Sequence, residues 1–479
     1  MTTPAEAPAP LSIWLALAPV AALFGAVILG IVVFGVGGEP LLIALLIAGF
    51  VATLVARQQG RSWGEVQAAA GRLVGEALPA LLVLLSIGAL LGSWMFSGTI
   101  PMLVVLGIDL IDPAWMALTA FVATALMSVV TGTSWGSAGT IGVAMMGAAA
   151  AMGLPLAPVA GAVVSGAYFG DKLSPISDMT NIAAIGAGAN LYRHIGHMLP
   201  TSLPPALIAM VAYGLLAGAG VGDAAQGAAG AAAIRAELVA LFEPGLWSAL
   251  PLAVALVGIA MRLPPAPVIL GSSLVALAVG ALAGGFPAAA GIHAFVGGFD
   301  LAKVAPDFGT SDSLANLVQR GGVVSMAPTL VYVFAAFVLA AGMEVSGALD
   351  VLLTRLLAAV RGTFGLIAAT MAAGAAMVGL TSNGGVTALV VGGLFRPSYA
   401  ERGLAPENLS RAVEDSATVT EPLMPWTVSA LFMASTLGVT TLEYAPWALF
   451  CWLGPVFGLL MALRHKLTGR GLMLAAERG

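Results

Sequence analysis

The chain has 479 residues, of which 59% are hydrophobic and only 9% are charged, with a formal net charge of -5 and a mean hydropathy of +1.01. A water-facing surface needs more charge than this, so the composition excludes a soluble globular domain and indicates an all-α polytopic membrane protein. The single cysteine, Cys451, excludes an intrachain disulfide.

The first apolar run follows a segment, residues 1–11, that contains no lysine or arginine. A cleaved signal peptide begins with basic residues, so we expect a cytoplasmic N-terminus followed by a retained membrane span. Apolar runs of about 17 to 25 residues are long enough to cross a bilayer. Such runs are predicted at 12–36, 40–56, 77–95, 201–219, 244–261, 265–284, 326–345 and 446–463.

Two longer segments, 113–152 and 362–396, read as pairs of helices that meet at a polar, glycine-containing turn. The first turn is Thr133-Ser134-Trp135-Gly136-Ser137, and the second is Thr381-Ser382-Asn383-Gly384-Gly385. Each pair leaves the membrane on the side from which it entered. The sequence leaves open whether the two limbs are re-entrant or span the bilayer fully.

Two other segments, 157–192 and 407–438, are interrupted by charged residues and prolines, around Asp171 and around Glu421. Each half has about 13 residues, or about 20 Å of helix, which is less than the bilayer core of about 30 Å. The two halves of each segment therefore make one span with an unwound middle.

The same units recur along the chain. Proline, Ser-Gly, Thr-Ser, Leu-Ala-Pro and acid-x-Leu-x-Pro matches appear in one order at spacings of 248 to 250 residues. The acidic match aligns Asp171 with Glu421. We therefore predict a first transmembrane repeat at 12–219, an external linker at 220–243, a second repeat at 244–464 and a cytoplasmic tail at 465–479.

Lysine and arginine then orient the repeats. With the interrupted segments counted once and the paired helices returning to their own side, the chain crosses about ten times, and most basic residues fall on the side of the termini. By the positive-inside rule that side is cytoplasmic. The second repeat is then inverted relative to the first, as in many secondary transporters, whose sites lie where discontinuous helices meet.

Polar residues at these interruptions are candidate ligands for a hard cation and a proton, because Na⁺ prefers carboxylate, hydroxyl, amide and carbonyl oxygens. The candidates are Asp171, Ser174, Ser177, Asp178, Asn181, Thr133, Ser134, Thr381, Ser382, Asn383, Thr420, Glu421 and Thr427. Four of them, Asp178, Asp171, Asn181 and Asn383, are expected to hold the Na⁺ ion. Supporting roles are expected for Lys172, Thr180, Glu414 and Asp415.

Exchange also needs an acid that binds a proton when the metal leaves, and a buried aspartate suits that role. We expect Asp178 to be the residue at which Na⁺ and H⁺ compete, followed by Asp171 and then Glu421. Lys172 either belongs to the site or neutralises Asp171 as a structural pair. Hydroxyl residues at the turns have an alternative role as helix caps.

Two further alternatives concern charged residues outside the core of the site. Glu414 and Asp415 can instead support a helix end or face Arg411. His194 and His197 read as a polar rim at the cytoplasmic face or as a pH sensor.

The run Gly170-Asp-Lys-Leu-Ser-Pro-Ile-Ser-Asp-Met-Thr-Asn181, with Arg193-His-Ile-Gly-His-Met198 after it, resembles the signature region of NhaC-type sodium/proton antiporters in the ion transporter superfamily. The run Glu414-Asp-Ser-Ala-Thr-Val-Thr420 and the pair Pro425-Trp426 are similar to the same family. Two residues depart from its pattern: Thr427 stands where we expect asparagine, and Glu421 stands where a small residue is commoner.

The resemblance implies an antiporter of the cell (inner) membrane that exchanges Na⁺ for H⁺ by alternating access. The superfamily also contains carboxylate carriers, so a sodium- or proton-coupled exchanger of a small organic anion is the alternative. A channel would need a continuous polar lining, and an intramembrane hydrolase fits the repeat poorly, so no enzyme is expected. No cofactor is expected beyond the transported ions. The expected partners are lipid and a second copy in a homodimer, and not nucleic acid.

Overall fold

The computed structural model describes residues 11–34, 38–218, 224–309 and 311–475. In these ranges the chain consists of helices joined by short turns, with one isolated bridge between Leu404 and Leu474 as its only β-type pairing. The predicted all-helical membrane fold is confirmed. Most of the expected N-terminus 1–11, residues 220–223 of the expected linker and residues 476–479 of the expected tail lie outside the described residues.

Each of the eight simple spans corresponds to a helix. They are α1 (Ile13–Phe34), α2 (Gly38–Gln58), α3 (Trp63–Phe96), α10 (Leu191–Gly218), α12 (Leu250–Ala260), α13 (Pro265–Leu282), α17 (Ala327–Val345) and α24 (Leu449–Thr468). Helix α3 begins 14 residues before the predicted span at 77, because Ser62 and Glu65 form a capping box at its start. In the described part of the chain, eight helices are long and apolar enough to cross a membrane, or ten if each of two bent pairs counts once.

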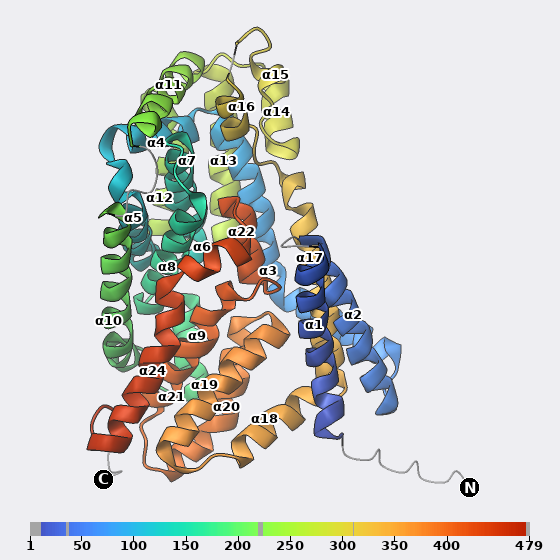
Figure 1. The fold of residues 1–479 in the computed structure, drawn as a ribbon. Coiled ribbons are helices and arrows are strands. Elements are labelled where there is room, and N and C mark those ends of the chain that lie inside the picture. Colours follow the sequence, from blue (N-terminus) through green and yellow to red (C-terminus); the bar gives the residue numbers. More distant parts are fainter. Residues whose placement is uncertain (1–10, 35–37, 219–223, 310, 476–479) are drawn as a thin grey trace.

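The two predicted hairpins lie at opposite ends of the molecule. The first consists of α5 (Met116–Thr131), α6 (Ser134–Ser137), the π-helical segment η2 (Ala138–Gly142) and α7 (Val143–Ala151). The second consists of α19 (Gly362–Thr381) and α20 (Gly384–Glu401). Figure 1 shows α5 and α7 in the upper half, with α4 (Thr99–Leu110) and α11 (Ala224–Phe242), whereas α19 and α20 lie in the lower half beside α18 (Ala348–Ala358). An inverted repeat requires this placement, and the inversion itself stays a prediction.

The two interrupted spans break where proline and serine or threonine meet. Helix α8 (Leu156–Leu173) ends at Ser174, whose backbone is extended, and α9 (Asp178–Ala187) begins after Ser177. Pro175 has no backbone N–H and disfavours a helical residue before it, so the break falls just after Asp171. In the second unit, α21 (Pro406–Val413) continues as the π-helical segment η5 (Glu414–Thr418) and the 3₁₀ turn η6 (Glu421–Leu423) before α22 (Val428–Leu437).

Local backbone geometry recurs at the spacing of the sequence repeat. A left-handed residue ends the first limb of each hairpin, at Gly132 and at Ser382. Side chains cap the helices that follow each turn or break, and left-handed glycines end α9 and α22. These pairs are Thr133 and Asn383, Ser177 and Thr427, and Gly188 and Gly438. The recurrence supports the predicted repeat, because helix caps and left-handed turns depend on the residues at and next to those positions.

Glycines let the interrupted helices approach their neighbours closely. A methyl group on Gly170 of α8 would lie 2.5 Å from the carbonyl oxygen of Ala125 in α5. A methyl group on Gly186 of α9 would lie 2.6 Å from the carbonyl oxygen of Ala388 in α20. Neither distance is tolerable, so larger residues would separate these helices. Each hairpin is thereby held against half of the first interrupted span.

The proposed orientation predicts the side from which new cysteines react. In a Cys451→Ala background, Ala283→Cys at the end of α13 should react with an impermeant maleimide from outside the cell, and Ala359→Cys after α18 only from inside. Both positions are exposed, and the native Cys451 is fully buried. Labelling of Ala359→Cys in intact cells would contradict the orientation.

Candidate ion-binding site

Four helices begin at the turns and breaks in the middle of the molecule, and a side chain caps each one. Thr133 accepts a hydrogen bond from the Gly136 N–H at 3.2 Å, and Asn383 accepts one from the Val386 N–H at 3.0 Å. Ser177 and Thr427 cap α9 and α22 in the same way. Of the turn hydroxyls weighed as caps, Thr133 takes that role. The capping oxygens of all four residues keep other lone pairs for a ligand.

Asp171 is a buried acid that hydroxyl groups hold in place. Its side chain lies in the last turn of α8, and the Ser134 hydroxyl donates a hydrogen bond to Oδ2 at 2.8 Å. The Ser177 hydroxyl interacts with the same carboxyl. Thr180 donates to the carbonyl oxygens of Asp171 and Lys172, each at 3.2 Å. The first hairpin and both halves of the first interrupted span thus converge on one carboxylate.

Lys172 does not neutralise Asp171, so that alternative is wrong. Adjacent residues of a helix point about 100° apart, and Lys172 therefore faces a different neighbour. Its ammonium group is fully buried and forms an ion pair with Asp415 of η5. Asp415 also accepts a hydrogen bond from Thr201 at 3.0 Å and lies 3.5 Å from Nε of Arg411. This pair links the interrupted spans of the two repeats.

Glu421 is the buried acid of the second break. One of its carboxylate oxygens lies beside Gly384 at the tip of the second hairpin, where an added methyl group would come within 2.8 Å of it. Ser429 interacts with the carboxylate. The Thr427 hydroxyl donates to the Glu421 carbonyl at 2.6 Å. Asp171 lies within electrostatic range of Glu421, so the two matched acids of the repeats share one region.

Asp178 is not buried, which corrects the expectation that it is. It is the first residue of α9, and its side chain is exposed in the structure. Asn181, one turn further, uses its amide N–H groups to cap the break, donating to the carbonyls of Pro175 at 3.1 Å and Ser177 at 2.7 Å. Asp178 still lies within electrostatic range of Asp171. Of these two aspartates, Asp171 is the buried one.

The other predicted hydroxyl residues bond to nearby backbone. Ser174 donates to the Val129 carbonyl at 2.8 Å, which ties the first break to α5. Thr381 and Thr420 each donate to the carbonyl four residues earlier, at 2.8 and 2.6 Å. Ser382 contacts the Trp426 carbonyl at 3.5 Å. Among the described residues, Asp, Glu, His and Cys side chains form no group of three with the spacing of a metal site.

Sequence reasoning missed a buried polar network beside the site. His194 and His197 are buried rather than part of a rim. His197 contacts Asn408 at 2.9 Å and Arg411 at 2.8 Å, and His194 contacts Ser410 at 2.7 Å. The signal was the run at 407–411, in which four of five residues are polar, on a helix that is buried in the structure. The network lies between Asp415 and the chain near Met473, which Asn408 also contacts.

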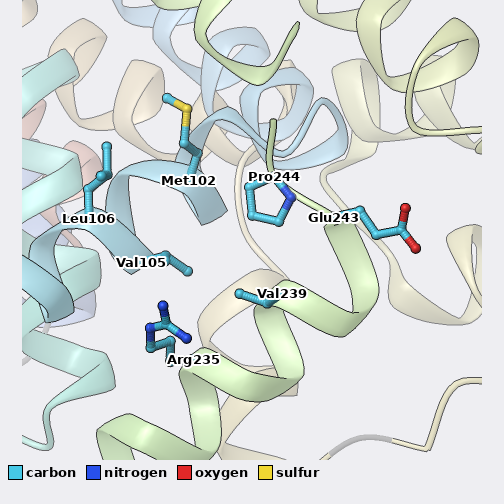
Figure 2. A pocket seen from close by; sticks show the side chains of 7 residues that line it. All are labelled: Met102, Val105, Leu106, Arg235, Val239, Glu243 and Pro244. Atoms are coloured by element: carbon cyan, nitrogen blue, oxygen red, sulfur yellow. The ribbon is translucent and has the colours of Figure 1, made fainter. Parts of the chain in front are cut away.

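One surface pocket lies away from these residues. Its volume is about 470 Å³. It lies between α4 and α11 (Figure 2) and is lined by Met102, Val105, Leu106, Arg235, Val239, Glu243 and Pro244. Arg235 is already paired with Asp109, at 2.6 Å and 2.9 Å. None of the predicted site residues lines this cavity.

Two alanine substitutions should distinguish a residue that supports Na⁺ binding from one that only caps a helix. Ser134→Ala removes a donor to Asp171, and we expect weaker Na⁺ affinity with little change in stability. Asn383→Ala removes a helix cap and should lower the free energy of unfolding by about 1 kcal/mol. Na⁺ titration and thermal unfolding of the purified variants measure both effects. Equal Na⁺ affinity in Ser134→Ala and the unaltered protein would return Ser134 to a structural role.

Comparison with known proteins identifies relatives of the whole chain. The sequence profile of the Na⁺/H⁺ antiporter family matches residues 5–178 and 166–464. An uncharacterized Na⁺/H⁺ antiporter of Haemophilus influenzae is 39% identical over 90% of this chain and 92% of its own length. The Na⁺/H⁺ antiporter NhaC of Alkalihalophilus pseudofirmus is 33% identical, covering 92% and 93%. A malate-2H⁺/Na⁺-lactate antiporter of Bacillus subtilis is 32% identical and covers 90% of each.

Proposed function

Because the chain belongs to the Na⁺/H⁺ antiporter family, we propose that it expels Na⁺ from the cell in exchange for H⁺ by alternating access. It is an integral membrane protein, and its relatives are antiporters rather than enzymes. We further propose that it resides in the cell membrane with both termini in the cytoplasm.

The observation that carries the proposal is the environment of Asp171. The carboxylate is buried at a helix break, where the Ser134 and Ser177 hydroxyls meet it. A buried charge of this kind is costly in a bilayer unless it binds a partner. Na⁺ and H⁺ both remove that cost, and they cannot bind the same oxygen together. Competition at one carboxylate couples the two fluxes if the site changes sides only with one of the ions bound.

Contacts between the repeats support an assignment of fixed and moving parts in such a cycle. The Lys172–Asp415 pair joins the breaks of the two repeats, and each hairpin tip contacts one break. We propose that the hairpins and breaks move relative to α1, α2, α3 and α17 so that Asp171 faces either side of the membrane in turn. Na⁺ is released outside and replaced there by a proton, and the proton is released inside and replaced there by Na⁺.

Reconstituted vesicles test the proposal. The purified protein is placed in liposomes that contain a pH-sensitive dye, a pH difference is imposed, and Na⁺ is added outside. We expect Na⁺ to dissipate the pH difference, K⁺ to do so less, and protein-free vesicles to show no response. A pH difference that Na⁺ leaves unchanged would contradict Na⁺/H⁺ exchange.

A second candidate is the exchange of small organic anions coupled to Na⁺ or H⁺. The malate-2H⁺/Na⁺-lactate antiporter is as similar to this chain as the NhaC relative is. The capped N-termini of α9, α20 and α22 at the breaks and the second turn would favour an anion beside the cation. Vesicles loaded with malate or lactate distinguish the two functions. Acceleration of Na⁺ flux by either anion would favour organic-anion exchange. An unchanged flux would favour cation exchange alone.

A further inference from the structure

The π-helical segment η5 holds two buried side chains whose oxygen atoms have no partner. The side chains are Glu414 and Thr418. Neither carboxylate oxygen of Glu414 nor the hydroxyl of Thr418 forms a hydrogen bond with the described residues. Glu414 is fully buried and Thr418 is 1% exposed. We propose that Glu414 and Thr418 form a second position for a small monovalent cation, Na⁺, separate from the one at Asp171. This proposal rests on the sodium transport proposed above and adds a binding position to it.

The neighbouring acid shows why Glu414 is unusual. Asp415 meets two cations, Lys172 and Arg411, and a hydroxyl from Thr201. Among the described residues, no hydrogen bond or ion pair reaches the Glu414 carboxylate. An unpaired carboxylate inside a protein costs several kcal/mol, so buried acids are normally paired or bind a cation. Asp415 is paired with basic side chains, and we assign a bound cation to Glu414.

The charges around Glu414 favour an added cation. Lys172 faces it from α8 and attracts its negative charge, whereas Asp171 from α8 and Asp415 from η5 repel it. With Arg411 included, the local balance is two positive groups against three carboxylates. Arg411 is already engaged by Asp415. A monovalent cation next to Glu414 would reduce this excess without disturbing the ion pair that links the repeats.

The arrangement of oxygens fits Na⁺ better than a proton. Thr418 lies one turn after Glu414, near enough to interact with its carboxylate but outside hydrogen-bond geometry. A protonated Glu414 has only the Thr418 hydroxyl nearby as a partner, and its second carboxyl oxygen stays unbonded, which costs about 1–3 kcal/mol. Na⁺ accepts three hard oxygens at once, and two carboxylate oxygens with one hydroxyl provide them. π-helical segments are also frequent at functional sites.

Equilibrium binding of radioactive Na⁺ to the purified full-length protein tests this position. We expect the unaltered protein to bind twice as much Na⁺ at saturation as Glu414→Gln does. Thr418→Val should retain the saturation level but weaken one of the two positions several-fold. Asp171→Asn should lose the other position and keep the one at Glu414. Thermal unfolding with and without Na⁺ gives an independent readout, because a bound ion stabilises the folded state.

Two matched variants control for the loss of buried polar groups. Thr436→Val removes another buried hydroxyl without a partner, in α22, and Glu407→Gln removes another buried carboxylate, which is paired with Arg193. Neither should change Na⁺ saturation. If Glu414→Gln does not fold, Thr418→Val against Thr436→Val decides alone.

The outcomes separate this inference from the proposed function. Equal saturation in Glu414→Gln and the unaltered protein overturns the second position while sodium transport stands. Unchanged Na⁺ binding with a shifted pH profile of exchange assigns Glu414 to the proton and also overturns it. Absence of Na⁺ binding by the unaltered protein overturns the proposed function itself.

Discussion

Replacing Asp171 by asparagine should reduce Na⁺/H⁺ exchange in vesicles to the level of protein-free liposomes. The amide cannot accept a transferable proton and carries no charge to balance Na⁺. Asparagine is close to isosteric and can still accept the hydrogen bond from Ser134, so folding should be retained. Dissipation of an imposed pH difference by added Na⁺ measures the effect, with size-exclusion chromatography to verify folding.

Asp178→Asn is the matched comparison, because Asp178 lies four residues beyond the break-forming Ser174 but is exposed. We expect this variant to retain exchange with an altered Na⁺ affinity, since it removes only a nearby negative charge. The reverse result, with Asp178→Asn inactive and Asp171→Asn active, would make Asp178 the carrier that the sequence predicts. Glu421→Gln in the same assay shows whether the second repeat also carries an ion.

Replacing Asp415 by asparagine should destabilise the protein by about 3–5 kcal/mol, because it leaves buried charges without their counter-ion. Both Lys172 and Arg411 lose their shared carboxylate, and both side chains are fully buried. Thermal unfolding in detergent should show the loss as a lower melting temperature. The double variant Lys172→Met/Asp415→Leu should recover part of the stability because it removes one charge of each sign. A melting temperature unchanged in Asp415→Asn would show that the pair contributes nothing net.

The sequence alone predicted the helices and the breaks well, for local reasons. Hydropathy located the spans, and Pro175 with its flanking serines located the first break to within a few residues. The 14-residue extension of α3 was missed because its first turns are polar and emerge from the apolar run. The four-residue α6 was predicted as the turn itself, and the segment η2 as part of a simple limb, since a π turn leaves no mark in composition.

The partners of the buried charges could not be predicted in the same way. Lys172 and Asp415 are 243 residues apart, and only the packing of two repeats brings them together. The sequence offered Asp171 as the nearer partner, but helix geometry turns adjacent side chains apart. Burial of His197 and exposure of Asp178 likewise depend on which neighbours cover each helix face. Residue type supplied the candidates for the site, and tertiary packing determines which contacts each of them makes.

During biosynthesis, Lys172 is made well before Asp415, its ion-pair partner in the second repeat. A ribosome adds about 5 to 20 residues per second, so Asp415 follows Lys172 after about 12 to 49 s for the 243 intervening residues. During that interval the first repeat carries a lysine in mid-membrane whose final counter-ion does not yet exist. The nascent α8 must therefore keep Lys172 hydrated or associated with the insertion machinery. Stable integration of the first half then waits for the second, and either half expressed alone should be degraded.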